Sequence, residues 1–439
     1  MPTSCWLFLF SVCFLCQTAL GYPHSVRKFS SNPFLRTYFT TKLLIAISYS
    51  NYYFTKEFVI ITYLIHKIYL TSMIRQRKNV SESKAAKSDT SSQKKVHDGR
   101  PSKLKVWVLA ARPHTLTASI SPVLVGASLV HHYQKHNTML MSPYSVSLMT
   151  LTFMAFAGLI QLGTNLHNDY ADFVKGADTN ERVGQARATQ KGWLTPFETA
   201  TGASFCLILA SFLGFALMVQ TGRYQDPYLI FMVVSSVFNA VCYTGGPYPL
   251  GYIGLGHLSI GYSGLGDLFV FIYFGFVATC TVPYCFLCQI LDSPSVSTLN
   301  VFHHELFVTS VIVALPVSFL ATAIIVVNNL RDRHTDVKVG KNTLAVRFGE
   351  TFARNEYKAL VQGSYIMLVP IAWRLKYLYG STEPLWVYFP LLSILRAKSE
   401  LKALSSKGKD GAALNEHVGG TARLQFMFCI MLVIALRNC

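Results

Sequence analysis

Long apolar stretches fill most of the chain after residue 105, and short polar segments separate them. The run 306–329, LFVTSVIVALPVSFLATAIIVVNN, is apolar over the ~20 residues that a helix needs to cross a bilayer. The pattern predicts an all-α, polytopic membrane protein. We expect nine spans, near 115–133, 146–166, 198–220, 227–243, 267–288, 306–329, 357–377, 383–396 and 420–437.

Composition favours a membrane protein over a soluble one. Of the 439 residues, 51% are hydrophobic and 14% are charged, whereas soluble domains average about 25% charged residues. A soluble all-α enzyme with a large core is the alternative, and the length of runs such as 306–329 argues against it. The lipid bilayer is therefore an expected partner, while the oligomeric state is left open.

Positive charge is concentrated at the N-terminal end. The formal net charge is +18, and residues 1–105 carry two thirds of it. Because this excess falls in a leader and a polar segment, it indicates targeting and solvation, and we expect no nucleic-acid partner. The ten cysteines lie mostly in apolar runs, so the lone C-x-x-C of Cys285 and Cys288 is expected to pack as small hydrophobic residues.

The first hundred residues resemble targeting segments. Residues 1–21 read as a signal peptide, and residues 22–74 begin with an acid-free stretch typical of transit peptides. Residues 75–104 are polar enough to form a disordered linker before a membrane domain at 105–439. This order resembles the bipartite presequence of algae with complex plastids, which predicts a plastid membrane, with another organelle membrane as the alternative. Two N-terminal anchor helices are the competing interpretation.

The first polar segment whose side chains indicate a functional site is NLHNDYADFVKGAD, residues 165–178, directly after an apolar span. Asn168 and Asp172 are four positions apart, and Asn165 and Asp169 have the same spacing. Residues four apart share one face of a helix. The segment therefore predicts a line of oxygen ligands at a membrane surface.

The second such segment is NNLRDRHTDVKVGKNTLAVRFG, residues 328–349, and it also follows an apolar span. Asn328, Asp332 and Asp336 fall at intervals of four and share a helical face. Four spans separate the two segments. An even number of crossings returns the chain to the same side, so both segments are expected at one membrane surface.

Carboxylates gathered at a membrane surface repel one another unless cations lie between them. Mg²⁺ prefers oxygen ligands and usually bridges carboxylates to phosphates, so the two segments predict a site for Mg²⁺ and a diphosphate group. Basic side chains in the same segments are expected to bind the remaining diphosphate oxygens. These are Lys175, Arg187, Arg331, Lys341 and Arg347. The competing interpretation is that the acids are solvated loop residues.

The two segments resemble the paired Asp-rich motifs of the UbiA superfamily of intramembrane aromatic prenyltransferases, over residues 105–439. Within it, the chain is similar to the branch that prenylates 1,4-dihydroxy-2-naphthoate in menaquinone and phylloquinone synthesis, because Asp172 and Asp178 are six apart with Lys175-Gly176 between. The insertion 251–260 departs from the family pattern. The strings that carry the resemblance are ARPHTLTASISPVLVGASL (111–129), QLGTNLHNDYADFVKGAD (161–178), YTGGPYPLGY (243–252), GLGDLFVFIYFG (264–275) and GKNTLAVRFG (340–349).

The resemblance implies nine transmembrane helices around a central cavity and a Mg²⁺-dependent reaction. A prenyl group, phytyl or polyprenyl, would pass from a prenyl diphosphate to 1,4-dihydroxy-2-naphthoate, with loss of diphosphate and CO₂. The implied ligands of Mg²⁺ and diphosphate are Asn168, Asp172, Asp332 and Asp336, with Asp169 and Asp178 nearby. The implied polar residues of the acceptor cavity are His114 and Tyr243.

Two other functions compete with this one. The acceptor could be another aromatic acid, such as homogentisate or 4-hydroxybenzoate, within the same superfamily. A membrane anion transporter is the alternative from a different class. Transporters place charged residues near the bilayer midplane, whereas the acids here cluster at span ends, which favours metal-dependent catalysis.

Overall fold

The computed structural model describes residues 101–138, 140–174, 183–184, 187–223, 226–242, 265–291, 298–338, 341–380, 384–405 and 409–439. All of them belong to the unit Ile68–Cys439. The expected signal peptide 1–21, the segment 22–74 and the linker as far as residue 100 lie outside the described residues. Helix α5 (Lys103–Ala111) begins two residues before the expected start of the membrane domain.

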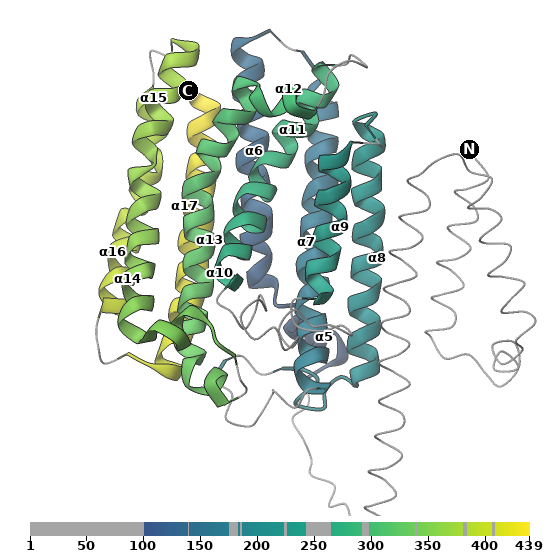
Figure 1. The fold of residues 1–439 in the computed structure, drawn as a ribbon, viewed down its shortest axis with the longest axis vertical. Helices are drawn as coiled ribbons and strands as arrows, with labels where there is room; N and C mark the ends of the chain where they lie inside the picture. Colours follow the sequence, from purple (N-terminus) through teal and green to yellow (C-terminus); the bar gives the residue numbers. More distant parts are fainter. Residues whose placement is uncertain are drawn as a thin grey trace, which may run out of the picture. The chain divides into compact units, whose positions relative to one another are not determined.

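Every regular element among the described residues is helical, so the all-α prediction is confirmed. Six expected spans are single helices in the structure (Figure 1). These are α6 (Leu116–His136), α7 (Pro143–Val174), α8 (Pro196–Gln220), α9 (Pro227–Cys242), α13 (Glu305–Lys338) and α17 (Asn415–Asn438).

The other three expected spans are composite. The fifth joins α10 (Leu265–Val270), the π-helix η2 (Phe271–Val277) and α11 (Ala278–Ile290). The seventh joins α14 (Leu344–Ile366) and α15 (Leu368–Tyr379), and the eighth joins the 3-10 helix η3 (Pro384–Ser393) and α16 (Ile394–Ser405). The short elements are η1 (Pro113–Thr115), α12 (Thr298–His303) and η4 (Gly411–Leu414).

Five helical stretches of the described residues are long and apolar enough to cross a membrane. The other expected crossings are shorter, more polar or interrupted: α6 carries His131 and His132, and α14 breaks from α15 at Met367. The nine-span count is compatible with the helices and stays a prediction. The five stretches are Pro143–Val174, Pro196–Gln220, Leu265–Ile290, Glu305–Lys338 and Gly411–Asn438.

Helix packing brings α6 against both α11 and α17, while α7 packs on α8 and α13 packs on α14 and α17. Small residues allow the closest crossings. A Cβ atom on Gly126 of α6 would lie 2.0 Å from the backbone oxygen of Thr279 in α11. One on Gly275 of η2 would lie 1.7 Å from Oγ of Ser318 in α13. These crossings hold α6 and α13 close to the same composite helix.

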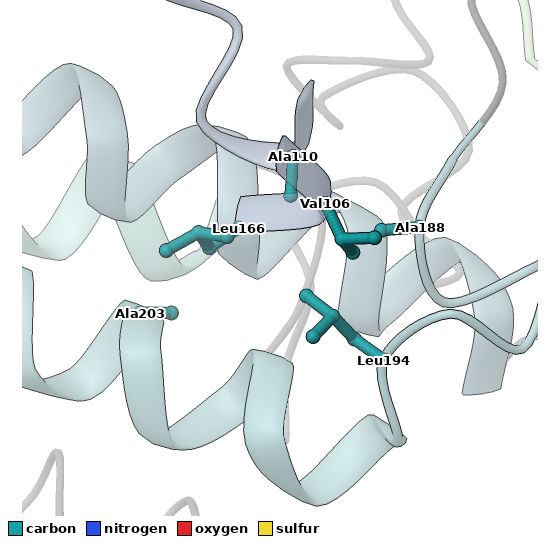
Figure 2. Packing of buried hydrophobic residues seen from close by; sticks show 6 residues of the cluster. All are labelled: Val106, Ala110, Leu166, Ala188, Leu194 and Ala203. Carbon is teal, nitrogen blue, oxygen red and sulfur yellow. The ribbon is translucent and has the colours of Figure 1, made fainter. Parts of the chain in front are cut away.

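A small apolar cluster fixes α5 against the C-terminal end of α7 and the start of α8. Val106 and Ala110 of α5 pack with Leu166 of α7, and the loop residues Ala188 and Leu194 join them (Figure 2). Each of these side chains is at most 4% exposed. Because the cluster includes both α5 and the loop, it positions the residues beside them, including two arginines that reach the first motif.

Candidate active site

The first motif lies on the last two turns of α7, so the expected helical spacing is confirmed. Asp169 is fully buried and accepts from two guanidinium groups. Arg112 forms one very short ion pair with it, and Nη1 of Arg187 lies 3.1 Å from its Oδ1. The backbone N–H of Ala188 donates to Oδ2 at 3.3 Å. These donors supply the charge-assisted hydrogen bonds that a buried carboxylate needs.

Arg187 also connects Asp169 to the next acid of the motif. Its Nη2 lies 2.8 Å from Oδ2 of Asp172, which is 3% exposed. Asn168, directly before Asp169 in the sequence, is half-buried. Asn165, by contrast, is held in the fold: its Nδ2 donates at 2.9 Å to the carbonyl of Ala111 and to the Thr115 hydroxyl. Asp169 and Asp172 are therefore the two carboxylates that Arg187 joins at this helix end.

The second motif lies on α13, which continues to Lys338, so Asn328, Asp332 and Asp336 share one helix as expected. Arg331 donates to both carboxylate oxygens of Asp332, at 2.7 and 2.6 Å, and to Oδ1 of Asn328 at 2.8 Å. Nζ of Lys341 lies 3.8 Å from Oδ1 of Asp336. This helix end therefore presents carboxylates that are already paired with basic side chains.

Asn415, the first residue of α17, connects the two polar segments. Its Oδ1 accepts from Nη1 of Arg331 at 3.1 Å, and its Nδ2 donates to the carbonyl of Val183 at 2.9 Å. Val183 and Gly184 follow the first motif, and a Cβ atom on Gly184 would lie 2.8 Å from Nη2 of Arg331. The segment after α7 and the end of α13 are therefore in contact at one end of the helices.

A second network holds the end of α13 to η4, the element just before Asn415. Arg333 is 9% exposed, forms two hydrogen bonds with Asp410 and lies 2.9 Å from Oε2 of Glu350. Burial alone would raise the pKa of Asp410, but hydrogen bonds from Arg333 and His334 outweigh it and lower the pKa to about 2. Asp410 is therefore a permanent anion that keeps η4 against α13.

Some of the expected site residues lie outside the described residues, and two others are located by their element alone. Lys175, Asp178 and Tyr243 lie outside the described residues, as does the insertion 251–260. His114 lies in η1, between the end of α5 and α6. Arg347 lies on the first turn of α14 and is exposed.

Three residues near the motifs were missed by the sequence reasoning. Arg112 is the only charged residue between Lys105 and Lys135, an isolation that could have marked it. Asn415 gave no signal, because its role depends on two distant segments. Asp267 of α10 is 5% exposed and accepts from Nδ2 of Asn329 at 3.1 Å, beside the second motif. A carboxylate at the start of an apolar span is the signal that could have singled it out.

Comparison with known proteins identifies relatives of this architecture. The family model described as "UbiA prenyltransferase family" matches residues 119–413, about two thirds of the chain. The 1,4-dihydroxy-2-naphthoate octaprenyltransferase of Escherichia coli is 32% identical over 269 residues, 61% of this chain and 76% of that protein. The Bacillus subtilis protein of the same name is 30% identical over 298 residues, 68% and 81% of the two chains.

One solved structure is also similar. It is described as "Structural and mechanistic insights into the biosynthesis of Digeranylgeranylglyceryl phosphate synthase in membranes" and covers 77% of this chain and 100% of its own. The TM-score is 0.35 and the identity is 15%.

Proposed function

Because this chain belongs to the UbiA prenyltransferase family, we propose that it transfers a prenyl group from a prenyl diphosphate to 1,4-dihydroxy-2-naphthoate. The relatives named for this acceptor support the proposal. The observation that carries it is the contact of the Asp-rich end of α13 with the segment that follows the first motif, through Arg331, Asn415 and Val183. Two acidic segments held near one another in this way can share a single diphosphate, as the reaction requires.

The residues of the two helix ends fit a metal that is shared with the substrate. Among the described residues, no three His, Cys, Asp or Glu side chains gather to hold a metal ion alone. Mg²⁺ that bridges carboxylates to phosphates needs only one or two carboxylates from the protein. Asp172 on one side and Asp332 and Asp336 on the other would supply them, with Asn168 and Asp169 beside them. Bound there, Mg²⁺ would neutralise charge that develops on the leaving diphosphate.

The arginines give these carboxylates a partner before the substrate binds. Arg187 holds Asp169 and Asp172, and Arg331 holds Asp332. On binding of metal and diphosphate, each guanidinium would turn to phosphate oxygens, with which it forms bidentate hydrogen bonds. The exchange keeps every buried charge compensated. Lys341 and Arg347, and Lys175 in the segment outside the described residues, are further proposed donors to the diphosphate.

The reaction itself breaks the allylic C–O bond, and the electron pair leaves with the diphosphate. The electron-rich naphthalene ring forms a bond to the allylic carbon at the position that carries the carboxylate. CO₂ then leaves, and the electron pair of the broken C–C bond returns to the ring and restores aromaticity. Apolar helices around the reacting carbon exclude water, which would otherwise capture the cation. His114 and Tyr243 are proposed to contact the acceptor, and Asp178 to lie beside the metal.

Product analysis tests this function and the choice of acceptor. The purified full chain is given octaprenyl, geranylgeranyl or phytyl diphosphate, with 1,4-dihydroxy-2-naphthoate, homogentisate or 4-hydroxybenzoate. We expect the decarboxylated prenyl-naphthalenediol, and we expect EDTA to abolish it and Mg²⁺ to restore it. If only homogentisate or only 4-hydroxybenzoate gave a product, that compound would be the acceptor in place of 1,4-dihydroxy-2-naphthoate. Absence of diphosphate release with every pair would overturn the enzyme assignment in favour of an anion carrier.

The N-terminal residues support a proposal about location. We propose that residues 1–21 and 22–74 deliver the enzyme to a plastid membrane, and that residues 75–104 link them to the catalytic unit. Fluorescence microscopy of the full chain fused at its C-terminus to a fluorescent protein, in an alga with complex plastids, tests it. Signal in another organelle would reassign the membrane without changing the proposed chemistry.

A further inference from the structure

A pocket of about 440 Å³ opens at the other end of the helices from the Asp-rich motifs. Its walls come from the C-terminal ends of α6 and α15 and from the junction of α12 with α13. Figure 1 shows α12 at the end of the unit opposite to α5. Glu305 in the pocket and Asp332 in the second motif are 27 residues apart in α13, or ~40 Å at the helical rise of about 1.5 Å per residue. The pocket is therefore separate from the candidate active site.

Aromatic rings form a continuous wall of this pocket. The rings of Tyr133 and Tyr379 are 6.5 Å apart in an edge-to-face arrangement. His304 lies 5.7 Å from Tyr133, and His136 lies 4.9 Å from Tyr379. Ring faces carry negative electrostatic potential, which attracts a cation that lies within about 6 Å of the ring centre. The wall is thus suited to a positively charged group with apolar substituents.

The hydrogen bonds of two imidazoles determine what they present to the pocket. Nδ1 of His136 lies 3.0 Å from the carbonyl of His132, and Nδ1 of His303 lies 2.8 Å from the carbonyl of Leu299. A carbonyl only accepts, so Nδ1 carries the proton in both rings and Nε2 is left as an acceptor in the neutral form. Two acceptor nitrogens therefore line the same pocket as the aromatic wall.

Glu305 supplies the formal charge among the lining side chains that the structure describes. Glu305 is exposed and is the only carboxylate in the wall, and none of the lining residues that the structure describes is Lys or Arg. The C-terminal ends of α6 and α15 carry negative partial charge, and Lys135 and Lys376 in the last turns of these helices offset part of it. Glu305 stands at the first position of α13 and faces the positive end of that helix. Burial lowers the pKa of His304, and this effect outweighs the opposing effect of Glu305. The lowered pKa favours the neutral form of the imidazole.

We propose that this pocket binds a small organic ammonium group, carried either by a phospholipid headgroup such as choline or ethanolamine or by a soluble amine. Tyr133 and Tyr379 would contact the cation through their ring faces, and Glu305 would neutralise it. The acceptor nitrogens of His136 and His303 would receive N–H donors where the amine has them. The volume lies within the range of about 300–1,000 Å³ that small-molecule sites occupy.

Binding measurements on the purified full chain test this site, in a detergent without ammonium groups. Tetramethylammonium and ethanolammonium chlorides are the soluble probes, followed by saturation-transfer NMR. Phosphatidylcholine, phosphatidylethanolamine and phosphatidylglycerol are compared by native mass spectrometry. We expect saturable binding of an ammonium probe, or retention of the first two lipids over the third, and Glu305→Gln should weaken it at least about tenfold. Tyr379→Leu should weaken it similarly.

Matched variants control for general damage. Tyr377→Leu changes an exposed tyrosine of the same helix, and Glu416→Gln removes an exposed carboxylate at the other end of the unit; neither should affect binding. If Glu305→Gln misfolds, His303→Ala, a substitution of an exposed residue, is tested in its place. We expect this variant to bind ethanolammonium several-fold more weakly. Binding of the soluble probes without lipid selectivity would identify a soluble amine as the ligand. Lipid selectivity that tetramethylammonium abolishes would identify a phospholipid headgroup as the ligand. The proposal is overturned by absence of both, or by equal binding in native, Glu305→Gln and Tyr379→Leu proteins.

Discussion

Arginines compensate carboxylates of both motifs, from distant parts of the chain at the first motif and from the neighbouring position at the second. Arg112 and Arg187 pair with Asp169 in α7, and Arg331 pairs with Asp332 in α13. Breaking a buried pair from one side leaves an uncompensated charge, which costs about 3–5 kcal/mol. Substitutions of these acids therefore affect both the local structure and the binding of a metal–diphosphate complex, and folding must be measured beside activity.

The metal-ligand role predicts that Asp172→Ala and Asp332→Ala each abolish turnover. Each variant removes a carboxylate that would hold Mg²⁺ and diphosphate, so diphosphate release should fall at least about 100-fold, or 2.7 kcal/mol. Insertion and elution on size exclusion should stay native. Glu416→Ala, an exposed carboxylate at the same end, is the matched control. Activity within about tenfold of the native protein in either acid variant would exclude that role.

The bridge at Asn415 predicts a positioning effect on substrate binding. Asn415→Ala removes the hydrogen bonds to Arg331 and to the Val183 carbonyl. We expect KM for the prenyl diphosphate to rise about tenfold, worth about 1.4 kcal/mol, with a smaller change in kcat. Asn438→Ala, at the other end of the same helix, is the control. An unchanged KM would show that the two segments hold their positions without this bridge.

At the scale of elements, the lengths of α7 and α13 fit the expectation that the two motifs lie at a membrane surface. Helices α7 and α13 have 32 and 34 residues, or ~48 and ~51 Å, against a hydrocarbon core of about 30 Å. Each helix therefore extends several turns beyond the apolar core. The acids lie in the last turns of α7 and α13, so we propose that these turns form the extensions. Ionised groups and a water-soluble diphosphate are both stable there, while the prenyl chain can reach the apolar helices beside them.

The close crossing of α6 and α11 predicts a stability effect. In Gly126→Ala, the new Cβ would lie 2.0 Å from the Thr279 backbone oxygen, so the helices must move apart. We expect a loss of about 1–3 kcal/mol, typical of overpacking, and a lower midpoint of thermal unfolding. Gly158→Ala in α7 is the control, since nothing lies within 4 Å of its new Cβ. Equal midpoints for the two variants would contradict the crossing.

At the scale of the whole molecule, α5 separates the N-terminal residues from the catalytic unit. The helix is N-capped by Ser102, whose hydroxyl accepts from Lys105, and its end delivers Arg112 to Asp169. Its packing with Leu166 and Ala188 makes it part of the active unit. The residues before it have a different proposed role, in delivery to the membrane.

Two truncations separate these roles. A chain of residues 101–439 keeps α5 and should restore quinone synthesis in a bacterium that lacks its own naphthoate prenyltransferase. A chain of residues 116–439 loses α5 and Arg112, and should lose at least about tenfold in turnover, or 1.4 kcal/mol. Inactivity of the first chain despite normal insertion would show that earlier residues belong to the fold. Full activity of the second would remove Arg112 from the site.

The sequence by itself determined the helices and the placement of the acids on them. Apolar runs long enough to cross the bilayer core predict the spans. Intervals of four place Asn168 with Asp172 on one helix face, and Asn328 with Asp332 and Asp336 on another. Both predictions succeed because they depend only on local helical geometry. Only the tertiary structure decided the partners of these acids. The contacts of Arg112 and Arg187 with Asp169, and of Asn415 with Arg331 and Val183, join positions 18 to 232 residues apart. Such contacts depend on which helix ends pack together, and no local period encodes that choice.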